Sequence, residues 1–180
     1  MDYTISQMIS EEEIDRRVRE MGAQISEDYA GKEVHILCIL KGASFFACEL
    51  AKRITVPLTI DFMHASSYGK GTVSSGVVTI DKDMTVSIEG KNVILVEDIV
   101  DTGRTLYTLK QLLAEKGATS IKVASLLDKP ERREIDLQAD YVGFVVPNAF
   151  VVGYGLDYDQ RHRNLPYIGT IEFKDGAENA

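Results

Sequence analysis

Residues 93–106, VILVEDIVDTGRTL, carry the side chains best suited to chemistry. The apolar start predicts a buried strand, Glu97 and Asp98 close it, and a turn of small residues then opens a helix. In that turn, backbone N–H groups lack intrahelical acceptors and the helix dipole is positive, which suits a dianionic phosphate. Buried carboxylates need hydrogen-bond donors, and a vicinal diol or a metal-bound water supplies them. The segment therefore predicts a site for a ribose phosphate.

Other readings of this segment are less specific. The chain has neither GxxxxGK[ST] nor GxGxxG, so the P-loop and dinucleotide patterns are absent. An apolar-Asp-Thr-Gly string also occurs in aspartic proteases, where two such aspartates share a proton. Here only one copy exists and a leucine-faced helix follows it, which does not fit an all-β protease dimer. For the turn alone, solvated acids and an Asp101 helix cap remain the structural alternative.

Strands and helices alternate around this segment. Ser10 and Glu13 form a capping box for a first helix that ends near Gly31. Further helices are predicted for residues 45–54 and 106–116, and strands for residues 34–40, 58–63, 92–96, 121–127, 141–146, 150–152 and 168–173, with a hairpin of residues 77–81 and 85–88. This order predicts one α/β domain over residues 1–180, with three layers, a mostly parallel sheet and ligands at the carboxyl ends of its strands.

The composition narrows the possible function. The length of 180 residues fits one domain, and 44% hydrophobic with 27% charged residues argues against both disorder and a membrane protein. A net charge of −8 opposes nucleic acid as a partner. Cys38 and Cys48 form no metal-binding pattern and are predicted to be reduced core thiols in a cytoplasm. No signal peptide or membrane span is expected. Ser- and Gly-rich residues 65–76 predict a long mobile loop, and residues 175–180 a loose tail.

The chain resembles the type I phosphoribosyltransferases, and in particular their hypoxanthine-guanine branch. Residues 93–106 are similar to the phosphoribosyl-diphosphate signature of that family. The other landmarks are LKG at 40–42, SSYG at 66–69, residues 123–129, FVVGYGLDY at 150–158 and RNLPYIG at 163–169, all in the family's order. The resemblance covers about residues 36–171 and implies the type I phosphoribosyltransferase fold with a small C-terminal base-binding hood.

The resemblance also implies a reaction and a site. The family transfers 5-phosphoribosyl from its 1-diphosphate to N9 of hypoxanthine or guanine, giving IMP or GMP plus pyrophosphate with Mg²⁺ in purine salvage. Asp101 matches the general base or proton partner at purine N7. Phosphoribosyl binding is implied for Glu97, Asp98, Asp101, Thr102, Gly103, Arg104 and Thr105. Pyrophosphate binding is implied for Lys41, Gly42 and Arg163, purine binding for Lys129, Phe150, Val151 and Asp157, lid contacts for Ser67 and Tyr68, and Mg²⁺ ligation for Glu97, Asp98 and Asp157.

Two alternatives stay open at this point. One is a non-catalytic sensor of phosphoribosyl diphosphate with the same fold, which the acidic composition and the purine-type C-terminal segment oppose. The other is a phosphoribosyltransferase for xanthine or a pyrimidine, since a fold alone does not define a substrate. The expected partners are small-molecule substrates, with no nucleic acid and no membrane, in a homodimer or homotetramer.

Overall fold

The computed structural model describes residues 3–67 and 78–173. Its helices are α1 (Glu11–Asp28), α2 (Ser44–Ala51) and α3 (Arg104–Glu115), with a short 3₁₀ helix η1 (Pro130–Arg132). The strands are β1 (Tyr3–Ile9), β2 (Val34–Leu40), β3 (Leu58–Ser67), β4 (Val78–Lys82), β5 (Asn92–Val100), β6 (Ser120–Asp128), β7 (Tyr141–Val145), β8 (Val151–Val152) and β9 (Ile168–Phe173). The alternation of strand and helix agrees with the sequence prediction.

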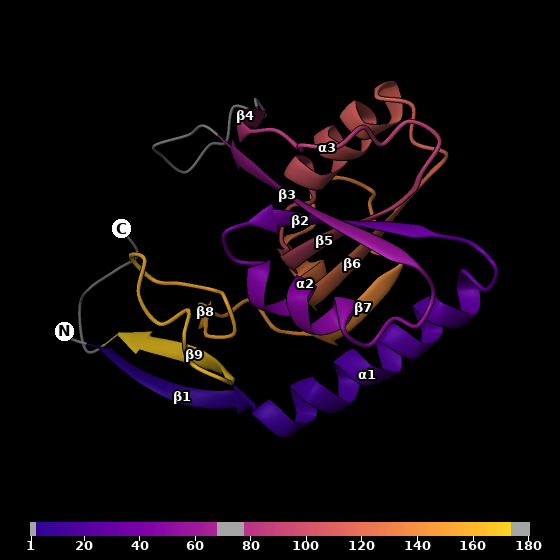
Figure 1. Cartoon of the computed structure of the whole chain (residues 1–180). Coiled ribbons are helices and arrows are strands. Elements are labelled where there is room, and N and C mark those ends of the chain that lie inside the picture. The colour runs from indigo at the N-terminus through magenta and orange to yellow at the C-terminus, as the bar shows by residue number, and fades with distance from the viewer. Residues whose placement is uncertain (1–2, 68–77, 174–180) are drawn as a thin grey trace.

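Six strands form the central sheet in the order β4-β3-β2-β5-β6-β7. Five of them run parallel, and β4 pairs antiparallel with β3 at one edge. In Figure 1, α3 lies on one side of this sheet and α1 and α2 lie on the other. Because parallel strands end at the same edge, the loops after β2, β5 and β6 come together there. The predicted three-layer α/β fold is confirmed.

The core consists of one apolar layer on each face of the sheet. On one face, Ile14 of α1 and Phe46 of α2 belong to the same buried cluster as Ile36 of β2. On the other face, Leu109 of α3 packs in a cluster with Leu95 of β5. Both faces of the central strands are therefore covered, which explains why β2 and β5 are continuous apolar runs rather than alternating ones.

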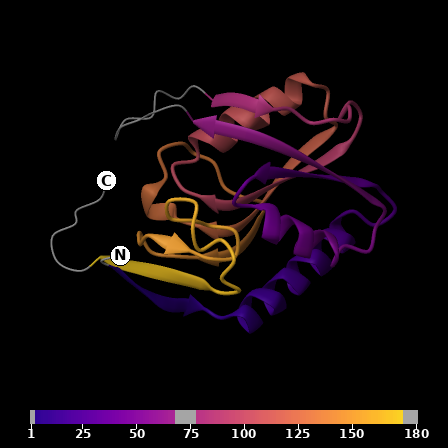
Figure 2. The ribbon, with the colours of Figure 1, turned by 60° about the vertical axis from the view of Figure 1, so that its left-hand side comes forward.

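A second sheet of three antiparallel strands, in the order β1-β9-β8, lies beside the main sheet. Figures 1 and 2 show β1 and β9 side by side, with both described chain ends at this small sheet. We call residues 150–173 together with β1 the hood. The expected C-terminal hood is present, but the sequence analysis missed its N-terminal strand. The alternating pattern of YTISQMI was the signal that could have found it.

The hairpin predicted from residues 85–88 is wrong. β4 pairs with β3, and residues 85–88 form no strand. The reason is Asp61, whose Oδ2 accepts hydrogen bonds from the N–H and hydroxyl of Thr85 at 2.6 and 3.0 Å and from the N–H of Val86 at 3.1 Å. A buried carboxylate thus satisfies donors that a partner strand would otherwise take.

Two further predictions concern the ends of the described ranges. The lid was expected to begin at residue 65, but residues 65–67 extend β3 and pair with β4. Tyr68 and the rest of the predicted lid lie outside the described residues, as does the predicted tail. Within the described part of the chain, no helix is long and apolar enough to cross a bilayer. Cys38 and Cys48 are both free; Cys38 is buried as expected, but Cys48 on α2 is exposed, so its prediction as a core thiol is wrong.

Candidate active site

The turn between β5 and α3 has the geometry of an anion site. Gly103 is the N-cap of α3 and has a φ of +85°, a left-handed conformation that favours glycine. Glycine contributes no capping side chain, and a phosphate oxygen is an acceptor suited to the positive end of the helix dipole. A depression of about 200 Å³ opens here, lined by Glu97, Ile99, Val100, Asp101, Thr102, Gly103, Thr105 and Leu106. Of the predicted phosphoribosyl-binding residues, all but Asp98 and Arg104 line this depression, and Nε of Arg104 instead donates to Glu134 at 2.5 Å.

A cation that the sequence analysis did not single out lies behind this turn. Nη2 of Arg133 donates to the carboxylate of Asp128 at the end of β6. A Cβ built on Gly103 would lie 3.1 Å from Cδ of Arg133, so the arginine stem packs against the glycine. The Arg133 and Asp128 side chains are only 15% and 16% exposed, so this ion pair is weakly screened and holds the arginine stem behind the phosphate turn.

Asp101 lies at the start of the same turn and is paired with an arginine. Its Oδ1 is 2.8 Å from Nε of Arg132, which lies in η1 after β6. The ion pair is partly exposed, so it contributes little stability, but it places a cation beside the carboxylate. Sequence analysis missed Arg132, because only the return of the chain along β6 brings η1 to Asp101.

Glu97 is a buried carboxyl and Asp98 a half-buried one, both near the carboxyl end of β5. Neighbouring strand residues point to opposite sides, so Glu97 lines the phosphate depression while Asp98 contacts the loop after β2. Burial, followed by the charge of Asp98, raises the pKa of Glu97 well above its usual range. Burial raises the pKa of Asp98 to about 6. Carboxyls in this state favour a proton, a hydroxyl donor or a cation beside them.

The loop after β2 brings Lys41 and Gly42 against Asp98. The Leu40–Lys41 peptide bond is cis. A Cβ on Gly42 would lie 1.6 Å from Oδ2 of Asp98, so only glycine allows this close approach. The position of the predicted pyrophosphate loop is thereby tied to the end of β5.

Arg163 approaches the same loop from the hood. Its Nη1 donates to the carbonyl oxygen of Gly155 at 2.7 Å, and its Nη2 is 2.8 Å from Oδ1 of Asp157. The side-chain oxygen of Gln160 accepts from both Arg163 Nη2 and Lys41 Nζ, each at 3.2 Å. The structure therefore brings the predicted pyrophosphate-binding cations together from positions 41 and 163.

The predicted purine-binding residues also converge. Nζ of Lys129 donates to the carbonyl oxygen of Ala149 at 2.6 Å, and burial lowers the pKa of this lysine. Phe150, which follows Ala149, is 44% exposed, and its ring packs edge-on against the ring of Tyr158 with centroids 5.4 Å apart. Val151 follows in β8 and pairs with β9. An ammonium group and an exposed aromatic face thus lie near each other, as recognition of a planar base requires.

Carboxylates that suit a divalent cation lie at Asp98 and Asp157. Their charges interact, since Asp157 adds to the effect of burial on the Asp98 pKa. Within residues 3–67 and 78–173, no three His, Cys, Asp or Glu side chains form a metal-holding group. Mg²⁺ is commonly held by one or two carboxylates, substrate phosphates and water, so this pair fits such an ion. The role of Glu97 as a metal ligand stays a prediction.

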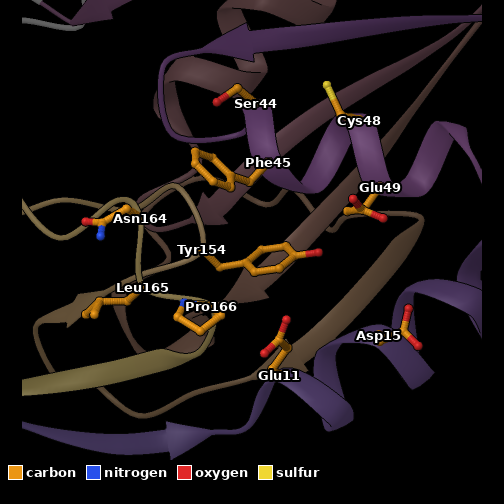
Figure 3. Close-up of a pocket in the computed structure, with 10 residues that line it drawn as sticks. All are labelled: Glu11, Asp15, Ser44, Phe45, Cys48, Glu49, Tyr154, Asn164, Leu165 and Pro166. Atoms are coloured by element: carbon orange, nitrogen blue, oxygen red, sulfur yellow. The ribbon is translucent and has the colours of Figure 1, made fainter.

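A larger cavity, of about 640 Å³, lies away from these groups, between α1, α2 and the hood. Figure 3 shows Tyr154 reaching across it between α2 and the start of α1. Its lining residues are Glu11, Asp15, Ser44, Phe45, Cys48, Glu49, Tyr154, Asn164, Leu165 and Pro166. None of the predicted site residues lines this cavity, so its volume and the sequence motifs point to different places.

Comparison with known proteins identifies the family. The model of the phosphoribosyl transferase domain matches residues 6–159, and the chain belongs to this family. A hypoxanthine-guanine phosphoribosyltransferase of Streptococcus thermophilus is 52% identical over 92% of both chains, and one of Bacillus subtilis is 51% identical over 92% of both. A crystal structure of a hypoxanthine phosphoribosyltransferase from Staphylococcus aureus superposes with a TM-score of 0.90 at 48% identity, covering 93% of this chain and 91% of the other. These relatives place the chain in the hypoxanthine-guanine branch, as its motifs indicate.

Proposed function

We propose that this protein transfers the 5-phosphoribosyl group of 5-phospho-α-D-ribose 1-diphosphate to N9 of hypoxanthine or guanine, giving IMP or GMP and pyrophosphate. The observation that carries this proposal is the arrangement at one sheet edge. The Gly103 turn offers a phosphate cradle, Lys41 and Arg163 offer a second anion site, and Phe150 with Lys129 offers a base site. An enzyme that joins a base to a ribose phosphate and releases pyrophosphate needs these three subsites side by side.

In the reaction, the bond from C1′ to the diphosphate oxygen breaks and the bond from C1′ to N9 forms. The bonding electron pair leaves with the diphosphate, so C1′ becomes cationic and the leaving group gains negative charge. Lys41 and Arg163 stabilise the departing diphosphate, and the Gly103 turn keeps the 5′-phosphate, and hence C1′, in place. The purine loses a ring proton, which the Asp101 carboxylate accepts, while Arg132 orients that carboxylate.

Base selection follows from Lys129. Its ammonium donates to O6 of a 6-oxopurine once it leaves the carbonyl oxygen of Ala149. Adenine carries an amino group at this position. That amino group and the Lys129 ammonium are both hydrogen-bond donors, so both would stay unpaired in the closed site. Phe150 stacks on the ring, and main-chain groups at Val151 and Asp157 bind the far edge of the base.

Magnesium would be held by Asp98 and Asp157 with diphosphate oxygens and would supply charge neutralisation to the leaving group. Water in the site would capture the cationic sugar, and the family resemblance assigns its exclusion to the predicted lid with Ser67 and Tyr68. The protein acts as a homodimer or homotetramer in the cytoplasm, a compartment in keeping with its two free thiols.

One assay tests the proposal. Protein, Mg²⁺ and phosphoribosyl diphosphate are mixed with each of hypoxanthine, guanine, xanthine, adenine and uracil, and nucleotide and pyrophosphate are measured. The expected result is product with hypoxanthine or guanine and loss of turnover with a chelator. Binding of phosphoribosyl diphosphate without turnover on any base would identify a sensor instead, and product with only xanthine or uracil would change the substrate.

A further inference from the structure

The hood residues between Asp157 and Arg163 include a tight turn, and one of its two central residues, Gln160, has a long side chain. Tyr158 and Arg161 exchange both backbone hydrogen bonds, at 3.1 and 3.0 Å. The two residues between them, Asp159 and Gln160, have φ values of +50° and +61°. This is a two-residue hairpin turn of the kind that glycine or asparagine usually fills. Glutamine in the left-handed region is unusual, and such residues often serve a site.

Gln160 is connected to the predicted diphosphate site through both its backbone and its side chain. Its N–H donates to Oδ2 of Asp157 at 2.8 Å, which anchors the turn. Its Oε1 accepts from Nζ of Lys41 and from Nη2 of Arg163, each at 3.2 Å. One neutral oxygen therefore lies where two cationic donors converge. A diphosphate oxygen needs donors arranged in this way.

The two cations depend on this oxygen to different degrees. Arg163 is also held by Asp157 and by the carbonyl oxygen of Gly155. In the described part of the chain, the Lys41 ammonium has the Gln160 oxygen as its side-chain acceptor. Lys41 and Arg163 repel each other, and a lysine side chain loses considerable rotamer freedom when it is fixed. Without the amide oxygen, Lys41 would turn away into solvent.

We propose that Gln160 is a positioning residue for the diphosphate subsite. It holds Lys41 towards Arg163 before substrate arrives and releases both donors when a diphosphate oxygen takes its place. The proposal rests on the function proposed above, since that function assigns diphosphate to these cations. It predicts that Gln160 affects affinity for diphosphate compounds, and leaves the 5′-phosphate and base subsites unchanged.

The test uses Gln160→Gly, which removes the amide and relieves the left-handed backbone, with Asp159→Gly as a matched control in the same turn. For Gln160→Gly, KM for phosphoribosyl diphosphate and Kd for pyrophosphate with Mg²⁺ should both rise about threefold to tenfold. This is the effect expected when Lys41 loses the one or two hydrogen bonds that hold it in place. Its kcat and its Kd for IMP should stay within about twofold, and its melting temperature should not fall. Asp159→Gly should leave all of these constants near wild type.

A double-mutant cycle with Lys41→Met tests whether Gln160 acts through the lysine. In the Lys41→Met background, Gln160→Gly should add no further loss of pyrophosphate affinity. Unchanged or tighter pyrophosphate binding by Gln160→Gly, an equal loss in Asp159→Gly, or an additive loss in the double variant would overturn the proposal. Calorimetry with pyrophosphate needs no turnover, so failure of this proposal is distinct from absence of transferase activity in the wild-type protein.

Discussion

Replacing Gly155 with alanine should displace the pyrophosphate loop and cost most of the activity. Gly155 has a φ of +105°, and a Cβ built on it would lie 1.9 Å from the carbonyl oxygen of Gly42. That distance is about 1.5 Å short of van der Waals contact. The atom that must give way is backbone, in the loop that carries Lys41, and the Gly155 carbonyl itself holds Arg163. A shift of the Gly42 carbonyl moves Lys41, and a shift of Gly155 moves Arg163. Either shift separates the two cations.

Comparison with a second glycine separates the backbone cost of Gly155→Ala from the cost of its steric collision. Gly31 has a φ of +74°, and a Cβ built on it would meet nothing within 4 Å, so Gly31→Ala incurs only the backbone cost, about 1–2 kcal/mol. Gly155→Ala adds the collision, so its loss of unfolding free energy should be about 2–5 kcal/mol in total. A shift of about 1 Å in a positioning group can cost about 100-fold in rate. We therefore expect kcat/KM for phosphoribosyl diphosphate to fall about 100-fold in Gly155→Ala.

Steady-state kinetics and urea unfolding of both variants, at a temperature where both are folded, provide the assay. Gly31→Ala should be slightly destabilised and fully active. Gly155→Ala should be folded but defective in diphosphate use, with a nearly normal Kd for IMP. If Gly155→Ala retained the kcat/KM of Gly31→Ala, the close packing of the hood on the pyrophosphate loop would have no role in placing Lys41 and Arg163.

Three other predictions address the chemistry and the fold. Asp101→Asn should lower kcat by about 100-fold or more while the Kd for IMP changes little, because only proton transfer is lost; unchanged kcat would remove its role. Lys129→Ala should lower the ratio of kcat/KM for hypoxanthine over adenine at least about tenfold, and full discrimination would refute the O6 contact. Burial tends to raise the pKa of Asp61, but its hydrogen bonds with Phe62, Thr85 and Val86 outweigh this and lower it. Because the pKa of Asp61 is lower in the folded state, its contribution to stability is present at neutral pH and is lost as pH falls below about 4. Asp61→Asn should therefore lower the free energy of unfolding by about 2 kcal/mol at pH 7 and by less at pH 3. An equal loss at both pH values in chemical unfolding would contradict this.

Residues near each other in the sequence allowed the most reliable predictions. The Ser10 capping box is present, with the Glu13 N–H and the Ser10 hydroxyl 3.2 Å apart, and the apolar face of α1 is buried as its spacing indicates. β2 has the predicted bounds, and the phosphate turn lies between a buried strand and a helix. These features depend on local periodicity and on the residue types at helix ends, and both are visible in the sequence.

Features that need distant segments were missed. β1 is a strand only because β9 pairs with it, and residues 85–88 are not a strand because Asp61 takes their donors. Arg132 reaches Asp101, and Gln160 reaches Lys41, through the path of the chain rather than through any spacing in the sequence. No local pattern encodes such meetings.

The sequence by itself determined which chemical groups this protein has and on which strand ends and turns they stand, because strand and helix periodicity and helix capping act over a few residues. Only the tertiary structure decided which of those groups share a site. Parallel strands carry their carboxyl ends to one edge, and the hood then packs its glycine onto the loop after β2, so that contacts over more than a hundred residues set the geometry of the diphosphate subsite.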